Sequence, residues 1–431
     1  MMSRTIEVEH LARVEGHGKI LVEIANGRAS NVQLKLVEGP RFFEGLVLGR
    51  RAEEVPVLMS RICAICSAGH KLTSIMAIEK ALEVQVSRQT ELLRELLHHG
   101  MYIESHGLHL YFLALPDYLG FTGAVELAPK YPEEVKRGLG IKKLGNTIQG
   151  MIGGRPINPE NAIVGGFGKV PNSEQLENLR EYLERLLPDA EQTVLAFAGL
   201  KYNDFAAGPA IFYALRPEGP EYGYFGQTIV SSLGEKIPVE EYRQICNEEV
   251  VLHSTAKQSR KDGNSFMVGC LARMNLLADR LTPRAKNLLQ KIGWMVPSHN
   301  PLHNNLARSI ELVYSFERCL AVIDELLANG VSQEPVDVMP RRAGRGVAAT
   351  EVPRGTLFHE YELDQEGRVV RANVVTPTAL NQANIEKDIA GCVSHVADKN
   401  DEEIERYLEM IARAYDPCIS CATHLVEVKH R

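Results

Sequence analysis

The feature that most constrains the fold is a pair of cysteine clusters at opposite ends of the chain. Cys63 and Cys66 form one CxxC pair, Cys418 and Cys421 form another, and a histidine follows each pair. Thiolates are soft ligands that suit zinc, nickel, copper and iron. Structural zinc sites usually draw both pairs from within about 20 residues, whereas roughly 350 residues separate these two. We expect the fold to bring the two pairs together at one metal centre. From spacing alone, three interpretations stay open: a structural zinc site, a catalytic thiolate metal site, and two unrelated pairs.

The composition is that of an ordinary globular protein. The chain has 431 residues, of which 45% are hydrophobic and 24% charged, which suffices for a large core. A net charge of -7 argues against a nucleic-acid footprint. We find no signal-peptide h-region and no apolar run of about 18 residues, and so expect a cytoplasmic protein, with export on a signal-bearing partner as the alternative. With no linker or repeat, we predict a single domain over residues 1–431.

The cysteine count is too low for a disulfide scaffold of this length. Four of the eight cysteines lie in the two CxxC pairs. We expect the others to be buried small hydrophobic residues: Cys246, Cys270, Cys319 and Cys392.

Two stretches predict β-hairpins. Apolar residues alternate across residues 5–37 on either side of an Asn-Gly turn, and residues 354–378 show two strand-like runs around a polar turn. Because a hairpin brings its ends together, Arg354 and Thr378 should be neighbours.

Helical periodicity dominates the rest of the chain. Cys63, Cys66 and His70 are spaced so that a helix would place all three on one face. Other helical stretches are residues 92–117, 176–186 (ended or kinked by Pro188), 306–320 and 400–411; residues 150–168 read as a loop. The predicted class is α+β, mainly α: a large helical core with small β layers near residues 5–37 and 354–378.

The two clusters resemble a known pair of motifs. Arg61-x-Cys63-x-x-Cys66-x-x-x-His70 and Asp416-Pro417-Cys418-x-x-Cys421-x-x-His424 are similar to the signatures of the [NiFe]-hydrogenase large subunit. Further segments resemble this family in the same order: residues 13–17 (Arg-Val-Glu-Gly-His), Arg41-x-x-Glu44, residues 353–355 (Pro-Arg-Gly) and Pro377-Thr378-x-x-Asn381. The chain looks most like the soluble, cytoplasmic, multimeric members.

The resemblance implies a binuclear site and a reaction. Cys63 and Cys418 would bind nickel terminally, while Cys66 and Cys421 would bridge nickel to an iron that carries CO and cyanide. Two cations also suit four thiolate charges better than one. The activity would be the reversible oxidation of H2 to protons and electrons.

The resemblance also gives roles to residues around the metals. Glu15 would relay protons, although by itself it could form a loop salt bridge with Arg13. Arg354 would hold its guanidinium over the open metal position, and Thr378 would donate to a cyanide ligand. The flanking groups are also implied by the resemblance: Asp117 and Asp416 beside the arginine, and His70 near a bridging sulfur.

A second metal site is implied near the C-terminus. Glu44, the backbone carbonyl of Val374 and His424 match the family's magnesium site. Seven residues follow His424. Either a maturation endopeptidase removes this short tail, or this family member is not processed. Asn158 stands where relatives often have histidine, which should affect local hydrogen bonds only.

The resemblance implies partners, because this chain has no cysteines left for an Fe–S relay. Electrons would pass to an Fe–S small subunit, and in the soluble group to further flavin or Fe–S subunits. Two alternatives remain: a relative of the complex I quinone-pocket subunit, which lacks these cysteines, and a zinc-stapled structural subunit. The sequence leaves the electron acceptor open.

Overall fold

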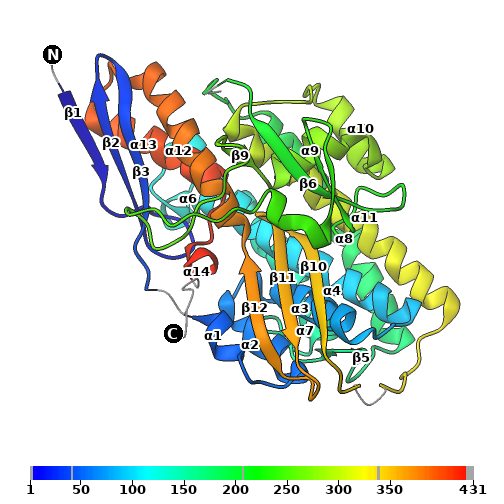
Figure 1. The fold of residues 1–431 in the computed structure, drawn as a ribbon. Helices are drawn as coiled ribbons and strands as arrows, with labels where there is room; N and C mark the ends of the chain where they lie inside the picture. The colour runs from blue at the N-terminus through cyan, green and yellow to red at the C-terminus, as the bar shows by residue number, and fades with distance from the viewer. Residues whose placement is uncertain (1–2, 40–41, 206–207, 337–339, 424–431) are drawn as a thin grey trace.

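The computed structural model describes residues 3–39, 42–205, 208–336 and 340–423. Helices form most of the regular structure and small sheets lie against them, which confirms the predicted α+β, mainly α class (Figure 1). Arg41, His424 and the tail 425–431 lie outside the described residues. Within the described ranges, no helix has both the length and the apolar character needed to cross a membrane.

The N-terminal hairpin is present and gains a third strand. The antiparallel sheet consists of β1 (Ser3–Val8), β2 (Gly18–Ala25) and β3 (Arg28–Leu36). Asn26 and Gly27 have φ values of 52° and 73°, as a two-residue turn with both central residues in the left-handed region requires. The sheet packs its apolar face against α12 (Pro377–Val396) and α13 (Asp401–Ala414), so the two chain ends share one core (Figure 1).

Long helices make up the larger core. They are α3 (Ser67–Leu82), α4 (Arg88–Leu108), α7 (Pro132–Gly153), α8 (Ser173–Ala198) and α11 (Asn304–Asn329). Helix α4 packs on α7 and α11. It continues through a π-helical stretch, His109–Ala114, into α5 (Leu115–Leu119), which confirms the predicted helix up to Asp117. Pro188 lies inside α8 and does not end it.

The second predicted hairpin belongs to a three-stranded sheet that lies over α3. Its strands are β10 (Gly344–Val352), β11 (Gly355–Leu363) and β12 (Val369–Val375), and β11–β12 is the expected hairpin. Strand β10 escaped the sequence analysis because its last seven residues are all buried, so it shows no alternation. A side chain at Gly346 would lie 1.9 Å from the Ala77 carbonyl oxygen, so the glycine lets β10 approach α3 closely.

A further β layer, which the sequence did not predict, covers the other side of this sheet. It contains β6 (Ile211–Arg216), β7 (Thr228–Ser231), β8 (Lys236–Pro238) and β9 (Phe266–Met267). The predicted loop at residues 150–168 begins inside α7 and holds a short pair, β4 (Ala162–Ile163) and β5 (Gly166–Phe167). The remaining α-helices are α1 (Phe43–Val47), α2 (Val55–Met59), α6 (Ala124–Leu127), α9 (Cys270–Leu277), α10 (Pro283–Lys291) and α14 (Ile419–Ala422).

Candidate metal centre

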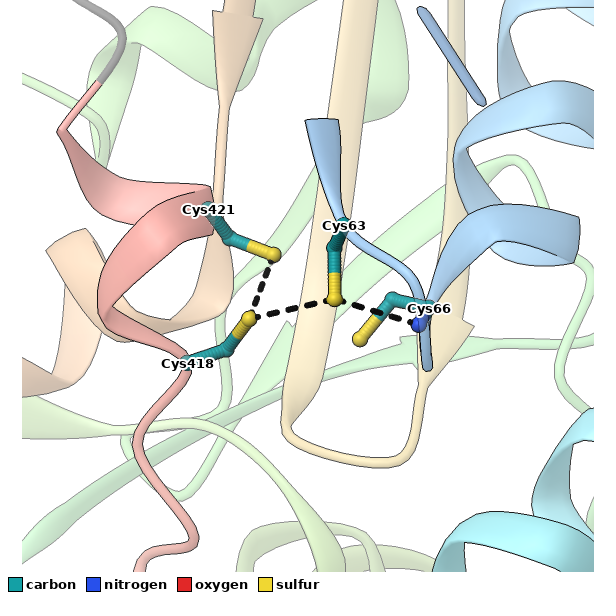
Figure 2. A group of neighbouring side chains, drawn as sticks. All are labelled: Cys63, Cys66, Cys418 and Cys421. Carbon is teal, nitrogen blue, oxygen red and sulfur yellow. Dashed lines mark hydrogen bonds between the residues drawn. The ribbon is translucent and has the colours of Figure 1, made fainter. Parts of the chain in front are cut away.

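The first cysteine pair lies before α3 and not on it. Cys63 has an extended backbone, and Cys66 is the N-cap of α3. The expected helical face carrying Cys63, Cys66 and His70 is therefore wrong for the two cysteines. The extended residue turns the Cys63 sulfur back toward the helix start, where the Cys66 N–H donates to it at 3.3 Å. The backbone thus points both thiols to one side (Figure 2).

The second pair lies on the last described turn of the chain. Asp416 has a left-handed backbone, with φ of 55°, and Pro417 follows it, so the chain leaves α13 sharply. Cys418 caps α14 and Cys421 lies within it. The Cys418 N–H donates to Thr378 Oγ1 at 2.9 Å, and the Ile419 N–H donates to the Glu15 carbonyl at 3.0 Å. These bonds fix the second pair to α12 and to the N-terminal loop.

The four thiols meet in the interior. Their sulfur atoms all lie within 4.8 Å of one another, and all four cysteines are at most 3% exposed. Figure 2 shows the sulfur atoms of Cys63 and Cys66 facing those of Cys418 and Cys421; Cys418 Sγ lies 2.7 Å from Cys421 Sγ and 3.3 Å from Cys63 Sγ. The two clusters therefore form one site, as their common chemistry indicated.

The electrostatics of the site favour bound cations. Burial raises the pKa values of the Cys418 and Cys421 thiols. Hydrogen bonds from the neighbouring thiols, together with the charge of Arg354, lower the pKa of Cys66. Four buried thiolates would carry four negative charges, which one guanidinium cannot balance, so metal cations match this donor set.

Arg354 lies directly against the thiols. It occupies the turn between β10 and β11, where its Nη1 donates to Cys66 Sγ at 2.8 Å. Its Nε donates to the Asp416 carbonyl at 2.7 Å, and its Nη2 to the Asp416 carboxylate at 3.1 Å. Although burial opposes ionisation of Asp416, Arg354 and then His109 hold the pKa of this carboxyl well below its usual range. Arg354 and Thr378 both contact the segment 416–418, which agrees with the expected proximity of the hairpin ends.

Asp117 has a different setting from the predicted one. Its carboxylate pairs with Arg13 and receives two hydrogen bonds from Arg413, at 2.8 and 3.0 Å. Among the described residues, no hydrogen bond or ion pair joins Asp117 to Arg354. The second neighbour of Asp416 is His109, whose Nδ1 lies 3.2 Å from its carboxylate. The sequence did not indicate this place for His109, because only the packing of the π-helical stretch His109–Ala114 against α13 brings it there.

Glu15 also lies at the thiols. Its Oε2 is 3.1 Å from Cys418 Sγ and accepts the Ser420 N–H at 3.0 Å. Its partner is therefore not the neighbouring Arg13, whose guanidinium contacts Asp117. Ser420 Oγ contacts Glu15 Oε1 at 2.5 Å and Glu38 Oε2 at 3.0 Å. Ser420 and Glu38 were not singled out from sequence, although Ser420 lies within the second CxxC pair.

Comparison with known proteins assigns this site to a family. A sequence model described as nickel-dependent hydrogenase matches residues 41–149 and 234–424, which include all four cysteines.

The chain belongs to the nickel-dependent hydrogenase family.

It is a [NiFe]-hydrogenase large subunit, the catalytic chain in which H2 is reversibly oxidised to protons and electrons. The alpha chain of sulfhydrogenase 1 from Pyrococcus furiosus is 40% identical over 423 residues, which cover 98% of each chain. A chain of the vhu F420-non-reducing hydrogenase from Methanocaldococcus jannaschii is 33% identical, covering 89% of this chain and 97% of that one. A solved structure of an NAD+-reducing [NiFe]-hydrogenase in the H2-reduced state matches with a TM-score of 0.86 and 26% identity, covering 98% and 99% of the two chains.

These similarities support the hydrogenase interpretation over the two alternatives, a zinc-stapled scaffold and a quinone-pocket relative. The relatives named are subunits of larger enzymes, so the hydrogenase large subunit belongs with partner chains.

His70 begins a buried chain of polar side chains within the hydrogenase subunit. Its Nδ1 lies 3.1 Å from His359 Nε2, His359 Nδ1 lies 2.7 Å from the Tyr361 hydroxyl, and that hydroxyl contacts Ser74 at 3.0 Å. The expected contact between His70 and a bridging sulfur stays a prediction.

Two of the three proposed magnesium ligands can be placed. Glu44 lies in the first turn of α1, which packs on the strand β12 that carries the buried Val374. His424 lies outside the described residues, so the complete ligand set stays a prediction. Asn158 has a left-handed backbone. Its N–H donates at 3.0 Å to the hydroxyl of Ser67, the residue that directly follows Cys66.

A second buried group of potential ligands has a structural role. His106, Cys270 and Glu311 lie close together, but Glu311 already accepts from Arg273 at 2.6 and 2.8 Å and from Tyr222 at 2.6 Å. Burial raises the pKa of Cys270 to about 12, and burial lowers that of His106 to about 4. A carboxylate neutralised by a guanidinium, beside a neutral thiol, does not need a metal cation.

Proposed function

We propose that the four buried cysteines hold one nickel and one iron ion. Cys63 and Cys418 would be terminal nickel ligands, while Cys66 and Cys421 would bridge the two metals, with CO and cyanide completing the iron coordination. The observation that carries this assignment is the convergence of all four sulfur atoms within 4.8 Å of one another in a buried site. Soft thiolates suit both metals, and two divalent cations balance the charge of four thiolates.

When bound, the metal pair supplies the redox-active position at which H2 is split. The protein supplies the charge and the proton acceptors around it. Arg354 holds a fixed positive charge against Cys66, anchored by two contacts to Asp416. Arg354 contacts Cys66, whereas Glu15 contacts Cys418, so the two side chains act on different thiols. The guanidinium of Arg354 stays charged throughout turnover.

Glu15 is the group that moves protons away from the thiols. Its carboxylate lies 3.1 Å from Cys418 Sγ, which is within reach of a proton carried by that sulfur. The Ser420 N–H and the backbone bond from Ile419 to the Glu15 carbonyl hold the carboxylate in place. Thr378 positions the Cys418 backbone and would donate to a cyanide ligand in addition.

The remaining parts of the proposal come from the family. Magnesium would be bound by Glu44, the Val374 carbonyl and His424. Electrons would pass to an Fe–S small subunit, then onward through further flavin or Fe–S subunits, because the other four cysteines are scattered and buried. We further propose a single domain over residues 1–431 and a cytoplasmic location. If the tail after His424 is removed, a maturation endopeptidase would be the enzyme that cuts it.

Metal analysis of the purified holoenzyme tests this assignment. The holoenzyme should contain both nickel and iron, with about one nickel per chain. Its infrared spectra should contain the bands of metal-bound CO and cyanide. Cys66→Ser should lose nickel and all H2-driven dye reduction, whereas Cys246→Ser, which changes a buried cysteine outside the four-thiol cluster, should keep both. Zinc as the sole metal, or full activity in Cys66→Ser, would refute the proposal.

A further inference from the structure

The contacts of Glu15 continue away from the thiols toward the protein surface. Ser420 Oγ lies 2.5 Å from Glu15 Oε1 and 3.0 Å from Glu38 Oε2. The other oxygen of Glu38 lies 3.3 Å from His17 Nδ1 and accepts the His17 N–H at 3.2 Å. An unbroken row of polar atoms therefore runs from Cys418 through Glu15, Ser420 and Glu38 to His17.

The outer end of this row lies at the surface of the chain. The His17 side chain is 82% exposed and that of Glu38 is 21% exposed, while Cys418 is 1% exposed. Both outer residues line a surface hollow of about 280 Å³ between the N-terminal loop and β2. The row thus spans the whole distance from the buried thiols to the surface of this chain.

The loop that carries His17 is built to approach α14 closely. Gly16 has φ of +88°, and a side chain there would lie 2.7 Å from Ile419 Cβ and 2.8 Å from Glu38 Oε1. A glycine at this position lets the backbone adopt the left-handed conformation and come within contact of both residues. The approach brings Glu38 to the hydroxyl of Ser420.

The hydroxyl of Ser420 lies between the two carboxyl groups of the row. A serine hydroxyl carries one hydrogen and can donate to only one acceptor at a time. Ser420 Oγ nevertheless contacts a carboxyl oxygen on each side. The hydroxyl can therefore accept a hydrogen bond from one carboxyl group while it donates to the other, and this geometry allows a proton to exchange between them.

We propose that Ser420, Glu38 and His17 form the proton exit of this hydrogenase chain, and this route rests on the proposed role of Glu15. In one transfer, the Glu15 carboxyl O–H bond breaks as its proton passes to Ser420 Oγ. The original Ser420 hydroxyl proton passes to Glu38, so the serine stays neutral and the net change is one proton moved outward. Glu38 then releases the proton to His17 or to water in the hollow, and H2 production uses the same steps in reverse.

The experiment compares variants of the assembled holoenzyme. Glu38→Gln preserves the shape of the side chain but cannot accept a proton, and it should slow H2-driven dye reduction roughly 100-fold while nickel content stays unchanged. Glu9→Gln is the matched control, because Glu9 lines the same hollow but pairs with Lys19 outside the row. It should keep wild-type turnover.

Two further measurements distinguish a relay from a structural role. Glu38→Ala should regain turnover as acetate is added, because a small carboxylate can enter the hollow and replace the missing group. Infrared difference spectra between acidic and neutral pH should show a carboxyl C=O band of wild type that shifts in D2O and is missing from Glu38→Gln. The second readout does not depend on turnover.

The outcomes separate the exit from the proposed function. If Glu15→Gln is slow while Glu38→Gln turns over normally and keeps the band, the exit is wrong and the role of Glu15 stands. If Glu15→Gln itself turns over normally, both are overturned. A slow Glu38→Ala that acetate does not restore, with the carboxyl band still present in Glu38→Gln, also overturns the exit by showing a structural effect.

Discussion

The buried ion pair between Arg273 and Glu311 gives a stability prediction whose size follows from its contacts. Both side chains are 0% exposed. Glu311 accepts two hydrogen bonds from Arg273 and one from Tyr222, and its other close neighbour is His106 Nε2 at 3.1 Å. Arg273 also contacts Glu351 at 2.7 Å and the Val352 carbonyl at 3.2 Å, so the pair supports the strand end that leads into Arg354.

The perturbation is Glu311→Gln, which keeps the volume and removes the charge. Each carboxylate oxygen accepts from Arg273, so the new amide N–H2 must face a guanidinium N–H in either orientation, and at least one donor loses its acceptor. Removing one partner of a buried ion pair typically costs about 3–5 kcal/mol. Because Arg273 keeps Glu351 as a counter-ion, we expect the lower part of this range, about 3 kcal/mol.

The expected shift in melting temperature follows from chain length. An unfolding entropy of about 2.1 cal/mol/K per residue over 431 residues gives about 0.9 kcal/mol per kelvin. Glu311→Gln should therefore lower Tm by about 3 °C, measured by calorimetry of the holoenzyme at neutral pH. The control Glu53→Gln changes a half-exposed carboxylate whose nearest cation lies 3.9 Å away, and its Tm should match wild type. A Tm for Glu311→Gln equal to that of the control would show that the pair contributes no net stability.

Two other predictions concern the metal site and a buried acid. Arg354→Lys should lower H2-driven turnover roughly 100-fold with nickel content unchanged, because a single ammonium cannot reproduce the contacts to both Cys66 and Asp416; wild-type turnover with nickel retained would contradict this. Burial raises the pKa of Asp388 from 3.8 to about 7 even though Tyr415 donates to it. Because the folded pKa of Asp388 is raised, its contribution to stability is present below about pH 4 and is lost as pH rises through 7. Asp388→Asn should therefore show a smaller fall in Tm than wild type over this pH range. Parallel profiles of Tm against pH for the two proteins would refute this.

Local patterns predicted those elements whose signal lies in short stretches of sequence. The Asn26-Gly27 turn and the alternation around it are observed, and the helix expected from residue 400 begins directly after Asn400, whose side chain accepts the Glu403 N–H. Strand β10 and the sheet β6–β9 were missed, because buried strands lack alternation and short strands depend on their neighbours. The helix expected through Cys63 is not formed. The Cys63 backbone is extended there, and its sulfur accepts the Cys66 N–H, an arrangement that apolar periodicity does not indicate.

The chemistry of the centre can be read from the residue types and their spacing. Four thiols in two spaced pairs, a glutamate, an arginine before glycine and an Asp-Pro-Cys turn can be read without coordinates, because ligand type and local spacing are properties of the chain. Tertiary structure alone decided which groups surround the thiols. His109 stands beside Asp416, Asp117 pairs with Arg13 and Arg413, and Glu38 meets Ser420, all across long separations in sequence. Such contacts follow from how helices and sheets pack, and no local pattern encodes them.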